Sequence, residues 1–85
     1  MSDCLFCGIA SGEVPADIVL REDHLVAFRD INPQAPVHVL VIPAAHHANA
    51  HELGEADPEL AGRLLRFAGR VADQEGISGY RIVMN

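Results

Sequence analysis

The five histidines of this 85-residue chain are the first residues whose type and spacing could do chemistry. They are His24, His38, His46, His47 and His51, and the last four fall within fourteen positions. Imidazole titrates near neutral pH and is a common metal ligand, so such a cluster suits catalysis or metal binding. The plain alternative is a solvated loop that holds the last three, with His38 as a satisfied sheet histidine. His38 shares a face of its predicted strand with Leu40 and Ile42, so we expect it to be the least solvated of the four.

The only two cysteines, Cys4 and Cys7, form a C-x-x-C pair near the start of the chain. Three hypotheses fit this spacing. Two sulfurs and one or two imidazoles can complete a tetrahedral zinc site. A redox dithiol is the second hypothesis, although such a pair ordinarily lies between a strand and a helix N-terminus, and no strand precedes Cys4. The third is a pair of free thiols that only pack.

A third candidate lies in the segment FRDINPQAP, where Phe28 and Asp30 are two residues apart at the end of a predicted strand. Their side chains therefore face the same side. An aromatic wall can contact a nucleobase while a carboxylate accepts hydrogen bonds from ribose hydroxyls. Asp30 is equally suited to cap the following turn. The chain has no Walker loop and no G-x-G-x-x-G, and no serine or cysteine nucleophile has an evident base partner in the sequence.

The composition limits the classes of protein and of partner. A chain of 85 residues with 49% hydrophobic content has enough apolar side chains for one small core. The net charge of −6 argues against a nucleic-acid polymer as partner, because phosphate binding needs clustered cations. A small phosphorylated ligand remains compatible with this charge. No signal peptide and no membrane-spanning run are found, so we expect a cytoplasmic protein that does not bind membranes.

Strands are predicted first along the chain. Residues 17–30 hold two short apolar runs around the polar letters REDH, which indicates a β-hairpin. Residues 37–43 are rich in valine and isoleucine and end at Pro43, which indicates a third strand. Residues 79–85 have the composition of another strand. Nothing after Asn85 turns or caps that strand, so we expect a chain that is truncated before the last strand of its domain.

One amphipathic helix is predicted between these strands, from Asp57 to Gly76. The prediction rests on an apolar stripe and on the signals at the start of the helix, where Asp57 suits the N-cap and Pro58 the first helical position. The stripe consists of Leu60, Leu64, Phe67 and Val71. A second apolar row, Ala61, Leu65, Ala68 and Ala72, widens the buried face enough to include a subunit contact. The order of elements predicts the α+β class with an antiparallel sheet.

Taken together, the combination F-x-D-I-x-P-x-A-P-x-H-x-L-V-I-P-x-x-H, the helix and GYRIVMN resemble the N-terminal three quarters of a histidine triad (HIT) domain, closest to the Hint branch. The resemblance covers nearly the whole chain and implies a single HIT domain over residues 1–85 that is incomplete at its C-terminus. Hint-type proteins are homodimeric purine-nucleotide binders. They hydrolyse nucleoside phosphoramidates and related adenylates through a nucleotidyl-histidine intermediate.

The resemblance also implies roles for individual residues. His38 matches the strand histidine that supports the catalytic imidazole, Asp30 the ribose ligand, and Asn85 an asparagine on the phosphate side. Arg29 stands where some relatives have histidine, which leaves base selectivity open. The base pocket would be lined by Leu5, Phe6, Ile9, Val14, Phe28 and Ile31.

For metal, the resemblance implies structural zinc on Cys4, Cys7 and His46, with His47 as an alternative ligand. The fourth ligand of zinc-containing relatives, the first triad histidine, is not in this sequence. No organic cofactor is expected.

The family signature, His-φ-His-φ-His-φ-φ with φ a hydrophobic residue, is absent from the 85 residues, so we expect this polypeptide itself not to turn over. Three functional hypotheses remain open. The first is a HIT hydrolase, which requires a reading frame that continues past Asn85 into three alternating histidines. The alternative is a non-catalytic module that binds nucleotide, zinc or a partner, and a thiol redox protein is a third and less favoured hypothesis.

Overall fold

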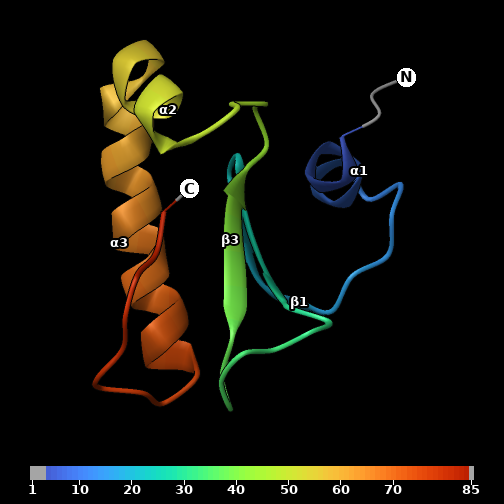
Figure 1. Cartoon of the computed structure of the whole chain (residues 1–85), viewed down its shortest axis with the longest axis vertical. Helices are drawn as coiled ribbons and strands as arrows, with labels where there is room; N and C mark the ends of the chain where they lie inside the picture. Colours follow the sequence, from blue (N-terminus) through green and yellow to red (C-terminus); the bar gives the residue numbers. More distant parts are fainter. Residues whose placement is uncertain (1–3, 85) are drawn as a thin grey trace. The chain divides into compact units, whose positions relative to one another are not determined.

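The computed structural model describes residues 4–84, which form three helices and three strands (Figure 1). In chain order these are α1 (Leu5–Ser11), β1 (Ile18–Glu22), β2 (Leu25–Arg29), β3 (Val39–Pro43), α2 (Ala50–Ala56) and α3 (Pro58–Gln74). The chain divides into two compact units, the first ending at His46 and the second beginning at His47. No helix among the described residues is long and apolar enough to cross a membrane.

The first unit contains an antiparallel sheet, as the sequence predicts, and the order of its strands is β1-β2-β3. β1 and β2 form the predicted hairpin around a two-residue turn, and Glu22 pairs with Leu25. His24 in this turn has a φ of 63°, in the left-handed region that histidine tolerates better than most residues. On the other side of β2, Phe28 pairs with Leu40 and Val26 with Ile42. The central strand is therefore paired on both edges.

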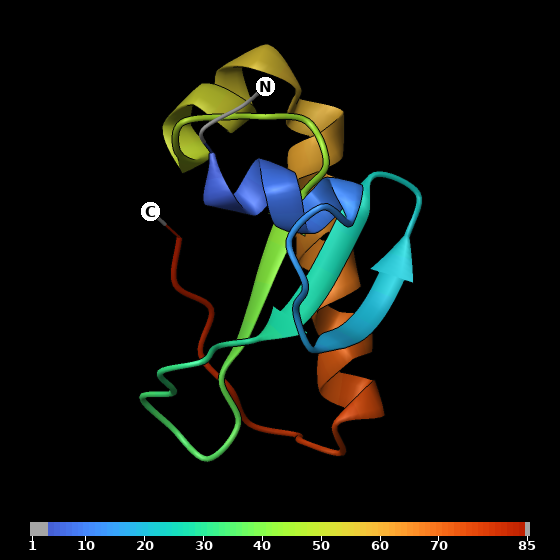
Figure 2. The same cartoon turned by 90° about the vertical axis from the view of Figure 1, so that its right-hand side faces the viewer.

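One face of this sheet is covered near the start of β2 by α1, which crosses the strand ends in Figure 2. Ile9 of α1 is buried together with Val26, Phe28 and Ile42. The Cys4 side chain caps the helix, and Gly12 ends it at a φ of 88°, which is strained for residues other than glycine. Ala10, Val14, Ala16 and Leu40 pack against the edge of the buried cluster.

Two further contacts hold α1 in place. The Arg21 guanidinium of β1 donates to the Ala10 carbonyl at 3.1 Å, where the negative end of the helix dipole favours a cation. The backbone N–H of Val14 donates to the Gly8 carbonyl at 3.0 Å. This approach is so close that a Cβ on Gly8 would lie 2.7 Å from Val14 Cγ2. Glycine at position 8 therefore lets the chain fold back under α1.

The second unit contains α2 and α3. α2 begins with a reciprocal cap, because Asn49 accepts from the Glu52 N–H while the Glu52 carboxylate accepts from the Ala48 N–H. α3 starts as predicted, with the Asp57 carboxylate accepting from the Leu60 N–H at 3.0 Å and Pro58 in the first turn. The helix buries Leu60, Phe67, Val71 and Ala72. The predicted stripe is thus the buried face, apart from the half-buried Leu64.

The structure differs from the sequence-based prediction in three elements: one predicted strand is not formed among the described residues, and two helices were not predicted. Residues 79–84 are not a strand, because a strand exists only through ladder bonds to a neighbour and these residues form none within the described chain. Their large apolar side chains are exposed, Tyr80 by 52% and Val83 by 74%. The helices α1 and α2 were not predicted, since seven residues are too few to show a helical period.

We expect Gly8→Ala to lower the free energy of unfolding by about 1–2 kcal/mol, because the new methyl group forces Val14 or α1 to move. Gly62→Ala is the matched control. No atom lies within 4 Å of an added Cβ at Gly62, so alanine should stabilise α3 by about 0.5–1 kcal/mol. Denaturant unfolding followed by circular dichroism measures both changes. Equal effects of the two substitutions would contradict the close approach at Gly8.

Candidate functional site

The first unit brings two groups of polar side chains together, and the first is the set Cys4, Cys7 and His46. Cys4 caps α1, so one helical turn places both sulfurs side by side, and the Cys7 N–H donates to Cys4 Sγ at 3.3 Å. His46 follows β3 by three residues, and its Nδ1 lies 3.2 Å from Cys7 Sγ. The three side-chain donor atoms all lie within 4.8 Å of one another.

This donor set fits zinc. Ligand atoms at 2.0–2.3 Å from a tetrahedral ion lie about 3.3–3.8 Å apart, so small side-chain rotations are enough to close three positions of the tetrahedron. Both cysteines are half-buried and His46 is exposed, which leaves the cluster open to solvent. The side-chain hydrogen bond with Cys7, the backbone N–H of Cys7 and, more weakly, His46 lower the pKa of the Cys4 thiol from 9.0 to about 7. Thiolate is the form that binds metal.

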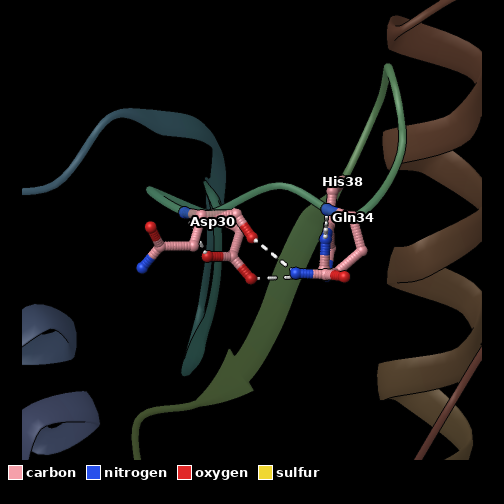
Figure 3. A network of polar contacts seen from close by, with 4 residues as sticks. Asp30, Gln34 and His38 are labelled. Atoms are coloured by element: carbon pink, nitrogen blue, oxygen red, sulfur yellow. Dashed lines mark hydrogen bonds and ion pairs between the residues drawn. The ribbon is translucent and has the colours of Figure 1, made fainter.

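The second group is formed by Asp30 and His38, with the backbone of Gln34 (Figure 3). His38 Nε2 lies 3.4 Å from Asp30 Oδ2, and His38 Nδ1 accepts from the Gln34 N–H at 2.9 Å. Asp30 Oδ1 accepts from the Asn32 N–H at 2.8 Å. The carboxylate therefore caps the turn, one of the roles left open by the sequence, and His38 has partners on both ring nitrogens.

The position of this pair follows from the alternation of side chains along β2 and β3. Val26 and Phe28 of β2 belong to the buried cluster, and Asp30 is the next residue of the same parity. Leu40 of β3 and His38, which directly precedes β3, form the matching row, and the Asp30 N–H donates to the His38 carbonyl at 3.0 Å. The polar pair thus extends the apolar face beyond the end that α1 covers. Both side chains remain partly accessible, Asp30 by 22% and His38 by 29%.

The residues expected to line a base pocket fall into two sets. Ile9 and Phe28 are buried, Val14 packs on their cluster, and the ring of Phe6 meets that of Phe28 at a centroid distance of 6.1 Å and a tilt of 50°. Leu5 is 61% exposed and Ile31 is 91% exposed. The structure therefore brings the first four together and leaves Leu5 and Ile31 facing solvent.

The remaining site candidates are Arg29, His47 and Asn85. Arg29 points to the opposite face of β2 from Phe28, and its Nε lies 3.5 Å from Asp17 Oδ2. His47 lies in the second unit, where its Nδ1 is 3.9 Å from Glu52 Oε1, and neither ring nitrogen has a hydrogen bond within the described chain. Asn85 lies outside the described residues.

Sequence reasoning missed Gln34, because it contributes through its backbone N–H and not through its side chain. The spacing of four residues between Gln34 and His38 carries no recognised motif. A turn-forming segment that ends in a histidine was the only available signal.

Comparison with known proteins places this arrangement in a family. The model of the HIT domain matches residues 11–85. The chain therefore belongs to the HIT family. It is similar to the purine nucleoside phosphoramidase of Escherichia coli K12, with 40% identity over 85 residues that cover 98% of this chain and 71% of that protein.

Two other relatives bear on the site. A 14 kDa zinc-binding protein of Brassica juncea is 43% identical over 86 residues, which cover 98% of this chain and 76% of that protein. A histidine triad protein from Clostridium difficile has a solved structure that superposes with a TM-score of 0.93 at 32% identity, covering all of this chain and 76% of that one. The α+β fold with an antiparallel sheet is thus the fold of the HIT family.

In metal-free protein we expect Cys4 to be alkylated by iodoacetamide with a pH midpoint near 7, because only its thiolate reacts and the pKa is lowered to about 7. Reactivity should rise as the pH is raised through that value. Cys7→Ala removes the side-chain hydrogen bond that lowers the pKa of Cys4 most, so it should move the midpoint toward 9.0. His46→Ala removes a weaker hydrogen bond and should move the midpoint less. Peptide mass spectrometry identifies the modified residue. A midpoint near 9 in the unsubstituted protein would contradict the hydrogen bonding described for Cys4.

Proposed function

We propose that the chain is the nucleotide-binding part of a HIT hydrolase that acts on purine nucleoside phosphoramidates and related adenylates. The observation that carries the proposal is the polar pair Asp30–His38, which continues the Phe28 face of the sheet and stays accessible. The similarity to a purine nucleoside phosphoramidase supports the substrate class.

In this proposal the nucleoside lies along the face of β2 and β3. Leu5, Ile31 and the exposed part of Phe6 contact the base, while the buried Ile9 and Phe28, with Val14 packed against them, support the Phe6 ring. Asp30 accepts hydrogen bonds from the ribose hydroxyls, because each carboxylate oxygen has lone pairs beyond those used within the chain. Asn85 is assigned to the phosphate side by the resemblance alone, and Arg29 is not needed in this arrangement.

The chemical step that we propose is a double displacement. An imidazole nitrogen attacks the α-phosphorus, the P–N bond to the amine breaks, and the amine leaves with a proton. Water then attacks the same phosphorus, the P–N bond to histidine breaks, and a nucleoside monophosphate is released. The nucleophile belongs to the alternating-histidine motif, which is not among these 85 residues. His38 serves the site without being that nucleophile.

We further propose that Cys4, Cys7 and His46 hold a structural zinc ion. His47 is the alternative to His46, and the fourth ligand of zinc-containing relatives is not among these 85 residues. Bound zinc would tie the start of α1 to the segment after β3, and it would supply stability and no reaction step. The named zinc-binding relative supports this assignment. No organic cofactor is included in the proposal.

The remaining assignments concern the protein as a whole. We propose a cytoplasmic homodimer, with Leu65 of the second apolar row of α3 at the subunit contact, because this side chain is 49% exposed while Ala72 of the same row is buried within the chain. A nucleic-acid polymer and a membrane are excluded from the proposed partners. Zinc binding without nucleotide binding would instead favour the alternative, a non-catalytic module.

The ribose role of Asp30 can be tested directly. Asp30→Asn should weaken binding of adenosine monophosphate by about 1–3 kcal/mol, because a charged hydrogen-bond acceptor is lost. Asp23→Asn is the matched control, since Asp23 lies in the turn at the opposite end of β2 and its substitution should leave the affinity unchanged. Isothermal titration calorimetry measures both. Equal affinity in Asp30→Asn and the unsubstituted protein removes Asp30 from the site.

The zinc assignment predicts one zinc ion per purified chain and thiols protected from titration until a chelator is added. Cys4→Ser and His46→Ala should each lose most of the metal, and His24→Ala should keep it because His24 lies in the β1–β2 turn. Atomic emission spectroscopy and thiol titration give the two readouts. Metal-free protein with two freely reactive thiols after purification in zinc would refute the site.

A further inference from the structure

Each ring nitrogen of His38 has a neighbour in residues 30–34: the backbone N–H of Gln34 at Nδ1 and the Asp30 carboxylate at Nε2. The backbone N–H of Gln34 donates to Nδ1 at 2.9 Å, and Nε2 lies 3.4 Å from Asp30 Oδ2. A nitrogen that accepts a hydrogen bond carries no proton, so the ring proton of neutral His38 is on Nε2. The Gln34 amide therefore selects the tautomer that presents an N–H to the Asp30 carboxylate.

Asp30 is held from two sides in the same way. Its Oδ1 accepts from the Asn32 N–H at 2.8 Å, and its Oδ2 faces His38 Nε2. Its backbone N–H is bonded to the His38 carbonyl at 3.0 Å, which fixes the two residues opposite each other across β2 and β3. With the Asn32 N–H donating to Oδ1 and His38 Nε2 within 3.4 Å of Oδ2, both carboxylate oxygens have a protein neighbour before any ligand arrives. One or more lone pairs on each oxygen remain for ligand hydroxyls.

We propose that His38 is a positioning residue for Asp30 and that the Gln34 backbone amide sets its tautomer. The inference deepens the proposed function, on which it rests. The oriented Asp30 carboxylate accepts a hydrogen bond from each of the two ribose hydroxyls, whereas a 2′-deoxyribose has one hydroxyl there and donates to only one carboxylate oxygen. This role differs from support of a catalytic imidazole, because Nε2–H is directed at Asp30. His38 thereby contributes to selection of ribonucleotides over deoxyribonucleotides.

Two substitutions at position 38 separate the two ring nitrogens. The side-chain amide of Gln reaches the place of Nε2 and can still donate to Asp30, whereas that of Asn reaches only the place of Nδ1. His38→Asn should weaken binding of adenosine monophosphate about tenfold, which is the usual effect of losing one hydrogen bond to a charged group. His38→Gln should recover most of that loss. Binding of 2′-deoxyadenosine monophosphate should change little in either variant, so the preference for ribose falls in His38→Asn alone.

The tautomer is read independently of any ligand by ¹⁵N NMR of the imidazole. The unsubstituted protein should show a protonated Nε2 and an unprotonated Nδ1 at His38. Gln34→Pro removes the backbone N–H and should give a mixture of tautomers, while Gln34→Ala keeps the N–H and should leave the signal unchanged. Asp30→Asn should shift the Nε2 resonance, because its partner loses charge.

The outcomes are distinguishable from a failure of the proposed function. If adenosine monophosphate does not bind at all, nucleotide binding is wrong, and the NMR measurements still decide whether His38 and Asp30 are linked. If it binds and His38→Asn and His38→Gln weaken it equally, or if Nδ1 carries the proton in the unsubstituted protein, His38 does not position Asp30.

Discussion

The alternation of side chains along β2 and β3 is the constraint on which the site depends. Because residues two apart face the same side, the row that buries Val26 and Phe28 must carry Asp30 on that side as well. The antiparallel pairing then brings the matching row of β3 alongside, and it sets His38 opposite Asp30. A slip of one residue in β2 would turn the Asp30 carboxylate to the other face, and a slip in β3 would turn His38; either slip would also expose part of the core. Core and site are therefore specified by one register.

The three strands of the first unit and the long helix of the second could be predicted from sequence because their signals are local. The valine- and isoleucine-rich runs around the letters REDH and before Pro43 correspond to the three strands. The Asp57 cap and the apolar stripe correspond to the start and the buried face of α3. α1 and α2 escaped prediction because each makes only two turns, and their capping residues, Cys4 and Asn49, are informative only once a helix is suspected.

The candidate site was predictable in its members and less so in its contacts. Asp30 and His38 stand out by residue type, yet two plain possibilities, a turn cap for the carboxylate and a satisfied sheet histidine, are also realised in the structure. Such roles are compatible with ligand binding, since both side chains keep exposed area. Gln34 acts through its backbone, which every residue except proline shares, so no pattern of side chains identifies it. Residues 79–84 show the opposite error, a strand that was predicted but does not form among the described residues. Their composition suits a strand, but a strand also needs a neighbouring strand for its backbone hydrogen bonds.

The segment between Asp30 and His38 is exposed along its whole length, while its two ends are joined by a backbone hydrogen bond just beyond the paired strands. The entropy of closing a loop rises only slowly with its length. Residues 35–37 follow the Gln34 amide and precede the histidine, so they can be exchanged or lengthened at small thermodynamic cost if the amide keeps its place. Evolution can therefore vary the rim of this site, and with it the ligands admitted, while the carboxylate keeps a constant orientation.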